Sequence, residues 1–229
     1  MLTLAVSSFF YDISSSDTFY WAAALLQCQF SRGWWSVDNE ATHNQSLQAY
    51  FELKHISSIH RYLTKDAAKQ PVTSCLLSGL DYFNSLLVGT PDSVIQSMQK
   101  VQNGASCLIL STPRHKNCTP LPQQFHWLPV FEWIKCKTAC MCYNTITGSD
   151  PSYLSELLHL YSPSRSLCSS WDTRMLKLQC FNHKTHGFHT FSYLGPHIWN
   201  NLLQNIRHSA TLSSFMSKLE TFLFAEYFS

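Results

Sequence analysis

The sequence predicts a mainly α-helical protein: a bundle-like helical fragment with a few short strands in 161–193. Three observations support this fold class. From residue 44 onward, apolar residues recur at intervals of three and four, the spacing of one helix face. Capping residues, prolines and glycines divide this pattern into segments of helical length. A chain of 229 residues with 45% hydrophobic side chains can also bury a core.

Residues 1–41 differ from the rest of the chain in charge and in pattern. They hold one basic and four acidic side chains, whereas residues 42–229 hold fifteen basic and ten acidic ones. They also lack a clean periodicity, and only a short helix near 19–29 is expected. We therefore predict an unrelated, poorly structured segment over 1–41, followed by one helical region over 42–229.

The first two helices of that region are predicted between residues 44 and 89. One begins near Asn44, and Thr64 is expected to cap the next, which Gly89 can end. Pro71 lacks a backbone donor, so the second helix either kinks there or begins there. The apolar face of the first helix is expected to comprise Leu47, Tyr50, Leu53, Ile56, Ile59 and Leu63.

Three further helices are predicted between residues 90 and 158. Thr90-Pro91 starts the first of these, which Gly104 weakens. Leu128-Pro129 starts the next, which ends before Gly148, and a short one follows from 149 to 158. The core face of the first of these helices is expected to comprise Val94, Met98, Val101, Ala105, Leu108 and Ile109.

The remaining residues alternate between strand and helix signals. Strands are predicted at 175–178 and 189–193, and helices at 198–206 and from Thr211 onward. Two tryptophans are expected in the core beside turns, Trp127 within 125–129 and Trp199 within 195–199.

The nine cysteines are irregularly spaced and odd in number, unlike a secreted disulfide framework. Cys75, Cys107 and Cys140 lie in apolar helical patterns, where a free thiol acts as a small hydrophobic group. These features predict a reducing compartment, the cytoplasm or nucleus, and no secretion. The apolar run Phe19–Leu26 is too short to span a bilayer, so no membrane partner is expected.

The motifs of the common enzyme classes are missing from the sequence. It contains no GxSxG, HExxH, Walker or GxGxxG motif. Cys136, Cys140 and Cys142 suggest a metal site, but a zinc site prefers a second matching pair of ligands. The histidines at 183, 186 and 189 surround Gly187 and share no firm face. We therefore predict no catalytic residue, metal site or cofactor.

Eight phrases of the chain resemble, in this order, the C-terminal part of the reverse transcriptase of LINE-type (non-LTR) retrotransposons. They are YFELKHISSIHRYLT, LDYFNSLLVGTP, the helix around Gln102-Asn103, TPLPQQFHWLP, SDPSYLSELL, YSPSRSL, FSYLGPHIWNNL and SSFMSKLETFLF. The resemblance implies the thumb and the helices beyond the palm, which would pack against template RNA. That family's polymerase holds Mg²⁺ with an Asp-Asp pair, and this chain has no two adjacent acidic residues. The resemblance therefore implies a non-catalytic fragment.

The chain also departs from the family in ways that favour a decayed copy. Family members commonly carry arginine where this chain has His55, His60, Cys107 and Cys168. Loss of these cations would weaken contacts with phosphates.

Two functions follow, and they predict different partners. Basic and aromatic side chains alternate between 114 and 184, a mixture that suits RNA or single-stranded DNA, although an ordinary solvated face has the same composition. The candidate nucleic-acid-binding residues are Arg114, Lys116, Lys135, Lys137 and Arg165. Alternatively, charged residues make up only 13% of the chain, which favours a small helical module that binds protein through exposed apolar surface. A metal-dependent enzyme is a third hypothesis, which the missing carboxylate cluster opposes.

Overall fold

The computed structural model describes residues 35–62, 64–72, 92–112, 125–150, 152–162, 174–179 and 190–228. These residues are mainly helical, which confirms the predicted fold class. The helices are α3 (Trp35–Ile59), η1 (His60–Tyr62), α4 (Lys65–Pro71), α6 (Asp92–Ile109), α8 (Val130–Thr147), α9 (Ser152–Ser155), α10 (Phe191–Asn200), α11 (Gln204–Arg207) and α12 (Leu212–Phe228).

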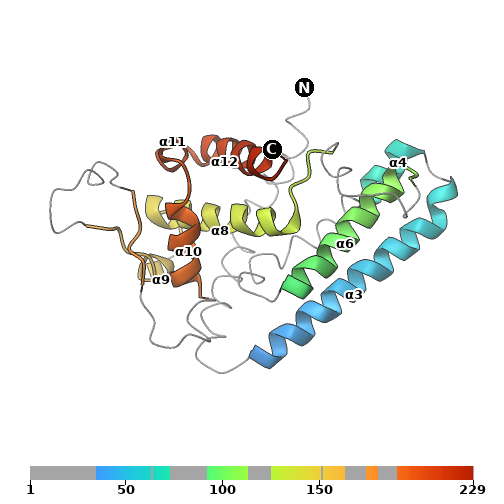
Figure 1. The fold of residues 1–229 in the computed structure, drawn as a ribbon, viewed down its shortest axis with the longest axis horizontal. Coiled ribbons are helices and arrows are strands. Elements are labelled where there is room, and N and C mark those ends of the chain that lie inside the picture. The colour runs from blue at the N-terminus through green and yellow to red at the C-terminus, as the bar shows by residue number, and fades with distance from the viewer. Residues whose placement is uncertain are drawn as a thin grey trace.

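Helix α8 lies at the centre of the molecule (Figure 1). Helices α3, α4 and α6 lie beyond its first turns, α9, α10 and α11 lie around its last turns, and α12 runs alongside it. Its first turns share a core with α3, α4 and α6, including Trp133 and Ile134. Its later turns share a second core with α9 to α12, including Met141 and Tyr143. Apolar residues therefore surround α8 on most sides, as is typical of a helix inside a bundle.

The start of α8 is held by two glutamines of α6. Pro129 precedes the helix and offers no side-chain cap. The backbone N–H of Val130 instead donates to Gln99 Oε1 at 2.9 Å, and Gln102 Nε2 donates to the carbonyl oxygen of Leu128 at 2.9 Å. The first N–H groups of a helix have no partner within that helix. Here a side chain of α6 supplies the partner for the N–H of Val130.

Several predicted helix ends are confirmed. Thr64 Oγ1 accepts from the N–H of Ala67 at 3.3 Å at the start of α4. Gly148 ends α8 with a φ of 75°, the left-handed conformation that glycine adopts without strain. Thr211 Oγ1 accepts from the N–H of Ser214 at 3.3 Å at the start of α12.

Helix α10 replaces the strand predicted at 189–193. Phe191 begins this helix, and Phe191 and Trp199 are both buried in the second core. Burial of these aromatic side chains outweighs their preference for strands. Trp199 lies in the core as predicted, although 195–199 are helical rather than a turn.

No strand forms at 175–178 either. Among the described residues, β-pairing is limited to one isolated antiparallel bridge between Leu160 and Leu176. The side chain of Asn200 takes the place of a neighbouring strand. It accepts from the N–H of Leu176 at 2.9 Å and donates to its carbonyl oxygen at 2.8 Å.

Helix α3 departs from its prediction in two ways. It begins at Trp35 rather than near Asn44, so the expected boundary after residue 41 lies inside a continuous helix. Its core face comprises Ala49, Leu53 and Ile56. Leu47, Tyr50 and Ile59 were expected there and are exposed instead. Three residues are less than one full turn of a helix, so a series of such steps moves gradually around the helix axis. Leu47, Tyr50 and Ile59 therefore lie away from the side that Ala49, Leu53 and Ile56 occupy.

Smaller corrections concern three other segments. Pro71 is the last residue of α4, so this helix does not begin there. The predicted kink concerns a continuation that lies outside the described residues. The short helix predicted over 149–158 forms only at Ser152–Ser155. Trp127 is half-buried and stacks on Phe125 at 5.0 Å between ring centroids. Residues 1–34 and the predicted end at Gly89 lie outside the described residues.

Candidate functional site

Two of the five predicted nucleic-acid-binding residues lie in described helices, both in α8. Lys135 Nζ pairs with Glu132 Oε1 at 2.9 Å and lies 4.6 Å from the centroid of the Phe131 ring. Lys137 is 4% exposed. The structure therefore gives these two residues no shared open surface, because one ammonium already has an acidic partner and the other is buried. The other three, Arg114, Lys116 and Arg165, lie outside the described residues.

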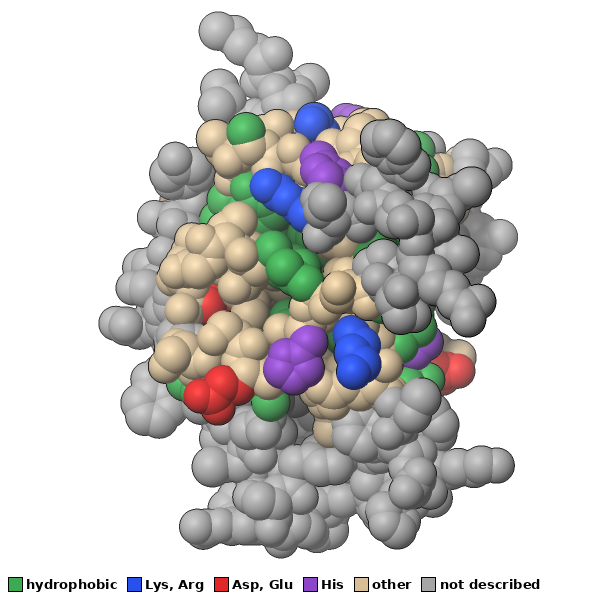
Figure 2. Space-filling view, turned by 90° about the vertical axis from the view of Figure 1, so that its left-hand side faces the viewer, with side chains coloured by type: hydrophobic (Ala, Val, Ile, Leu, Met, Phe, Trp, Pro, Cys, Tyr) green, Lys and Arg blue, Asp and Glu red, His purple; other side chains and the backbone are tan. Residues whose placement is uncertain are grey.

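The face shown in Figure 2 carries no concentrated charge in its coloured, described part. Lysine or arginine side chains lie beside histidines in its upper and lower parts, and acidic side chains lie apart from them, with hydrophobic side chains in between. A phosphate backbone is held by several cations acting together, so this scattered arrangement does not form an electrostatic binding surface.

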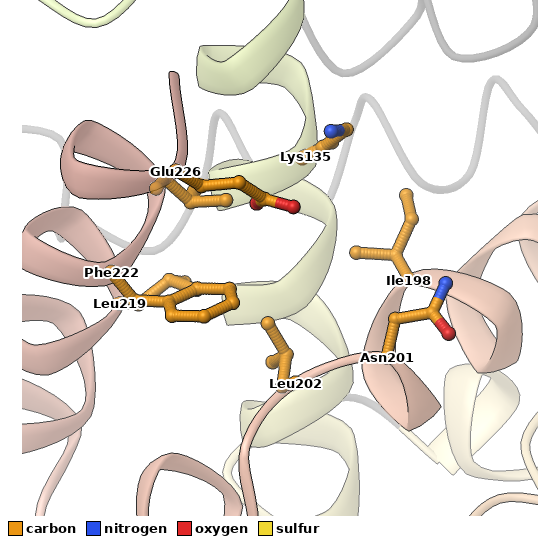
Figure 3. Close-up of a pocket in the computed structure, with 8 residues that line it drawn as sticks. Lys135, Ile198, Asn201, Leu202, Leu219, Phe222 and Glu226 are labelled. Carbon is orange, nitrogen blue, oxygen red and sulfur yellow. The ribbon is translucent and has the colours of Figure 1, made fainter. Parts of the chain in front are cut away.

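A pocket of about 120 Å³ lies between α8, α10 and α12. Its apolar lining comprises Ile198, Leu202, Leu219, Phe222 and Leu223. Lys135 and Glu226 come from facing helices and point toward the same space, with Asn201 nearby (Figure 3). A cavity of roughly 150 Å³ holds one benzene ring, so this pocket has room for a single small apolar group.

Two of the buried thiols of α8, those of Cys136 and Cys142, have raised pKa values. A hydrogen bond with Cys140, together with burial, raises the pKa of Cys136, and burial raises the pKa of Cys142. Their protonated forms are weak nucleophiles and weak metal ligands. The described residues hold no group of three or more His, Cys, Asp or Glu side chains placed to bind a metal ion.

Cys107 is disulfide-bonded, so the expectation of a free thiol is wrong for this residue. Its partner lies outside the described residues, since the described cysteines 136, 140 and 142 are free. Cys107 therefore does not support the predicted reducing compartment.

Glu220 of α12 has a perturbed acid–base equilibrium. Burial raises its pKa from 4.5 to about 7. Its charge also raises the pKa of Cys136, which places it close to α8.

Five of the large hydrophobic side chains that are exposed in the described part of the chain lie on α3 and η1, at the edge of the molecule (Figure 1). We name the surface that they form the outer face of α3. It comprises Leu47 (42% exposed), Tyr50 (50%), Phe51 (56%), Ile59 (50%) and Tyr62 (81%). Leu47 and Phe51 lie opposite the side that packs on α6, where Leu53 is 3% exposed. Tyr50 and Ile59 lie at the two edges of the face. Sequence reasoning missed this surface because it assigned Leu47, Tyr50 and Ile59 to the core.

Two described residues from the phrases that carry the resemblance, Gln102 and Trp199, lie at joints between helices. Gln102 is 1% exposed and holds the start of α8, as described above. Trp199 is fully buried, and its Nε1 donates to the carbonyl oxygen of Arg174 at 2.6 Å. These side chains maintain packing and backbone pairing, and they leave no polar group facing a substrate.

Comparison with known proteins gives no assignment, since no family model, no curated protein and no solved structure matches the chain. Within the described residues, every helix is too short or too polar to cross a membrane.

Proposed function

We propose that this chain is a non-catalytic helical module that binds a protein partner through the outer face of α3. The observation that carries this proposal is the exposure of five large apolar side chains on one helical segment. Tyrosine and phenylalanine, which supply three of these five side chains, are enriched where proteins meet.

We further propose that the module descends from the C-terminal part of a LINE-type reverse transcriptase. The eight phrases of the sequence support this origin. The buried positions of Gln102 and Trp199 support a role for these phrases in folding. The missing Asp-Asp pair supports the absence of polymerase chemistry.

RNA or single-stranded DNA binding is a second proposal. It is supported by the basic and aromatic side chains that alternate between 114 and 184 and by the exposure of Lys177. Binding of this kind weakens steeply as salt is added, whereas an apolar contact holds or strengthens. Gel shifts with RNA at low and high salt therefore separate the two proposals.

A photo-crosslinking residue at Tyr50 tests the first proposal directly. We replace Tyr50 by benzoylphenylalanine in the full chain, expressed in cultured cells, and irradiate. Lys100 of α6 is also exposed and serves as the control position. We expect protein adducts from position 50 and few from position 100. Adducts that nuclease removes, or equal yields at the two positions, would contradict the proposal.

A further inference from the structure

The pocket between α8, α10 and α12 has walls that the core holds in place (Figure 3). Leu202, Leu219 and Leu223 line it and are at most 6% exposed. All three also belong to the second core, which fixes their positions. Ile198 of α10 and Phe222 of α12 complete the apolar lining, and both are half-buried. The pocket is therefore formed by packed side chains of the fold itself.

Three polar side chains surround this pocket, and two of them have no partner. Lys135 Nζ pairs with Glu132 Oε1 at 2.9 Å and keeps further N–H donors, since an ammonium group has several. Within the described part of the chain, neither the Glu226 carboxylate nor the Asn201 side chain has a hydrogen-bond partner. The rim of the pocket thus offers a cation, an unpaired anion and an amide to a molecule that enters.

The size of the pocket limits which molecule can enter. Its volume is about 120 Å³. A cavity of roughly 150 Å³ holds one benzene ring, so this pocket suits a branched aliphatic group of about four carbon atoms. Ligand sites commonly combine an apolar hollow with a few polar groups that fix the orientation of the ligand. The polar part of such a molecule would stay at the rim.

The two opposite charges at the rim select the class of ligand. A carboxylic acid without an amine would bring a second anion close to Glu226, and like charges destabilise a contact. An amine without a carboxylate would bring a second cation close to Lys135. A small molecule that carries both charges meets each of these side chains with the opposite charge.

We propose that this pocket binds a free α-amino acid with a branched aliphatic side chain, such as leucine. The aliphatic group enters the pocket, the carboxylate accepts hydrogen bonds from Lys135 and Asn201, and the ammonium donates to Glu226. The pocket shares no residue with the outer face of α3, so binding there does not depend on the proposed function.

Titration of the full chain by ligand-observed NMR tests the class of ligand with L-leucine and two analogues. Isocaproate lacks the ammonium of leucine, and isoamylamine lacks its carboxylate. We expect leucine to bind about fivefold more tightly than either analogue, because each analogue leaves one charge at the rim without its opposite. Equal affinity for the three molecules, or no binding of leucine at millimolar concentration, would overturn the proposal.

Glu226→Gln tests the contact with the ammonium. We expect this variant to bind leucine about fivefold more weakly and isocaproate no more weakly than the parent does, because only leucine carries an ammonium. Glu156→Gln removes another exposed carboxylate, and we expect it to change neither affinity. An unchanged affinity of Glu226→Gln for leucine, or an equal loss for both molecules, would contradict the role of Glu226.

Ile198→Trp tests the pocket itself. The larger side chain is expected to fill the pocket and abolish leucine binding. Leu203→Trp enlarges a side chain that is 51% exposed and outside the lining, and we expect it to bind leucine as the parent does. Circular dichroism checks that both variants fold, and the Glu226→Gln comparison decides if Ile198→Trp does not. Leucine that binds a folded Ile198→Trp as tightly as the parent would overturn the pocket as its site.

Discussion

Arg207 shows how a single buried cation can replace a helix cap. It is 6% exposed, and its Nη1 donates to the carbonyl oxygens of Asn200 at 2.9 Å and Leu202 at 2.6 Å. These carbonyls lie at and just beyond the end of α10, where helical partners run out. The positive charge also complements the negative end of the helix dipole.

Replacement of Arg207 by methionine tests this cap. We expect Arg207→Met to lower the free energy of unfolding by about 2–3 kcal/mol, because buried carbonyl oxygens lose a charged donor. Urea denaturation measures the change. Lys177→Met at an exposed position serves as the control, with an expected change within about 0.5 kcal/mol. Equal stability of Arg207→Met and the control would show that the cap contributes nothing.

Glu220 gives the stability of the protein a defined pH dependence. Its pKa rises from 4.5 to about 7 on folding because burial disfavours the charged carboxylate. Between these values the folded state binds more protons than the unfolded state. This residue's contribution to stability is therefore greatest below pH 4.5, falls as the pH rises through about 7, and is constant above it.

Glu220→Gln should remove this dependence. We expect the variant to be more stable than the parent at pH 8 by on the order of 1–2 kcal/mol, reduced from the full shift because the side chain is partly exposed. At pH 4 the two proteins should be nearly equal. Urea denaturation at both pH values measures the difference, and an identical gap at the two would contradict the assignment.

At the scale of helices, Gly104 permits the close approach of α3 and α6. A Cβ atom at this position would lie 2.9 Å from Leu53 Cδ2. The sequence identifies Gly104 only as a weak point of a helix. The structure adds that a larger side chain would meet the buried face of α3, so the glycine contributes to packing between the helices.

We expect Gly104→Val to lower the free energy of unfolding by about 2 kcal/mol, because the added methyl groups overpack this contact. Leu53→Ala removes the methyl group that the new side chain meets. The double variant should therefore lose less stability than the sum of the two single variants, as a double-mutant cycle in urea would show. Additive losses would indicate that the two residues do not meet.

At the scale of the molecule, the shared helix α8 joins the two cores into one cooperative unit. Trp133 belongs to the core with α3 and α6, and Met141 belongs to the core with α10 and α12. A helix buried in both cores cannot leave one and remain fully packed in the other. Local unfolding of either end should therefore be suppressed until α8 itself is released.

Hydrogen exchange on a core variant tests this coupling. Phe215 of α12 is fully buried and stacks on Tyr143 at 4.6 Å between ring centroids. We expect Phe215→Leu to reduce the protection of α12 amides and, by a similar free energy, that of α6 amides. Exposed Phe131→Leu serves as the control for loss of an aromatic ring. Unchanged protection in α6 would show two independent units.

The sequence by itself determined the features that depend on a few neighbouring residues. The helical class and the helix limits at Thr64, Gly148 and Thr211 follow from periodicity, capping and the conformational freedom of glycine. Each of these requires only contacts within one or two turns, so the local sequence specifies it.

Tertiary structure alone decided which surfaces are buried. The outer face of α3 and the burial of Lys137 depend on where α6 and the helices around α8 lie, and 191–193 are helical because Phe191 enters a core. These outcomes arise from contacts between segments far apart in the chain, and burial energies at such contacts exceed local preferences. A face that looks apolar in the sequence therefore becomes core or exposed surface according to the neighbours that the fold supplies.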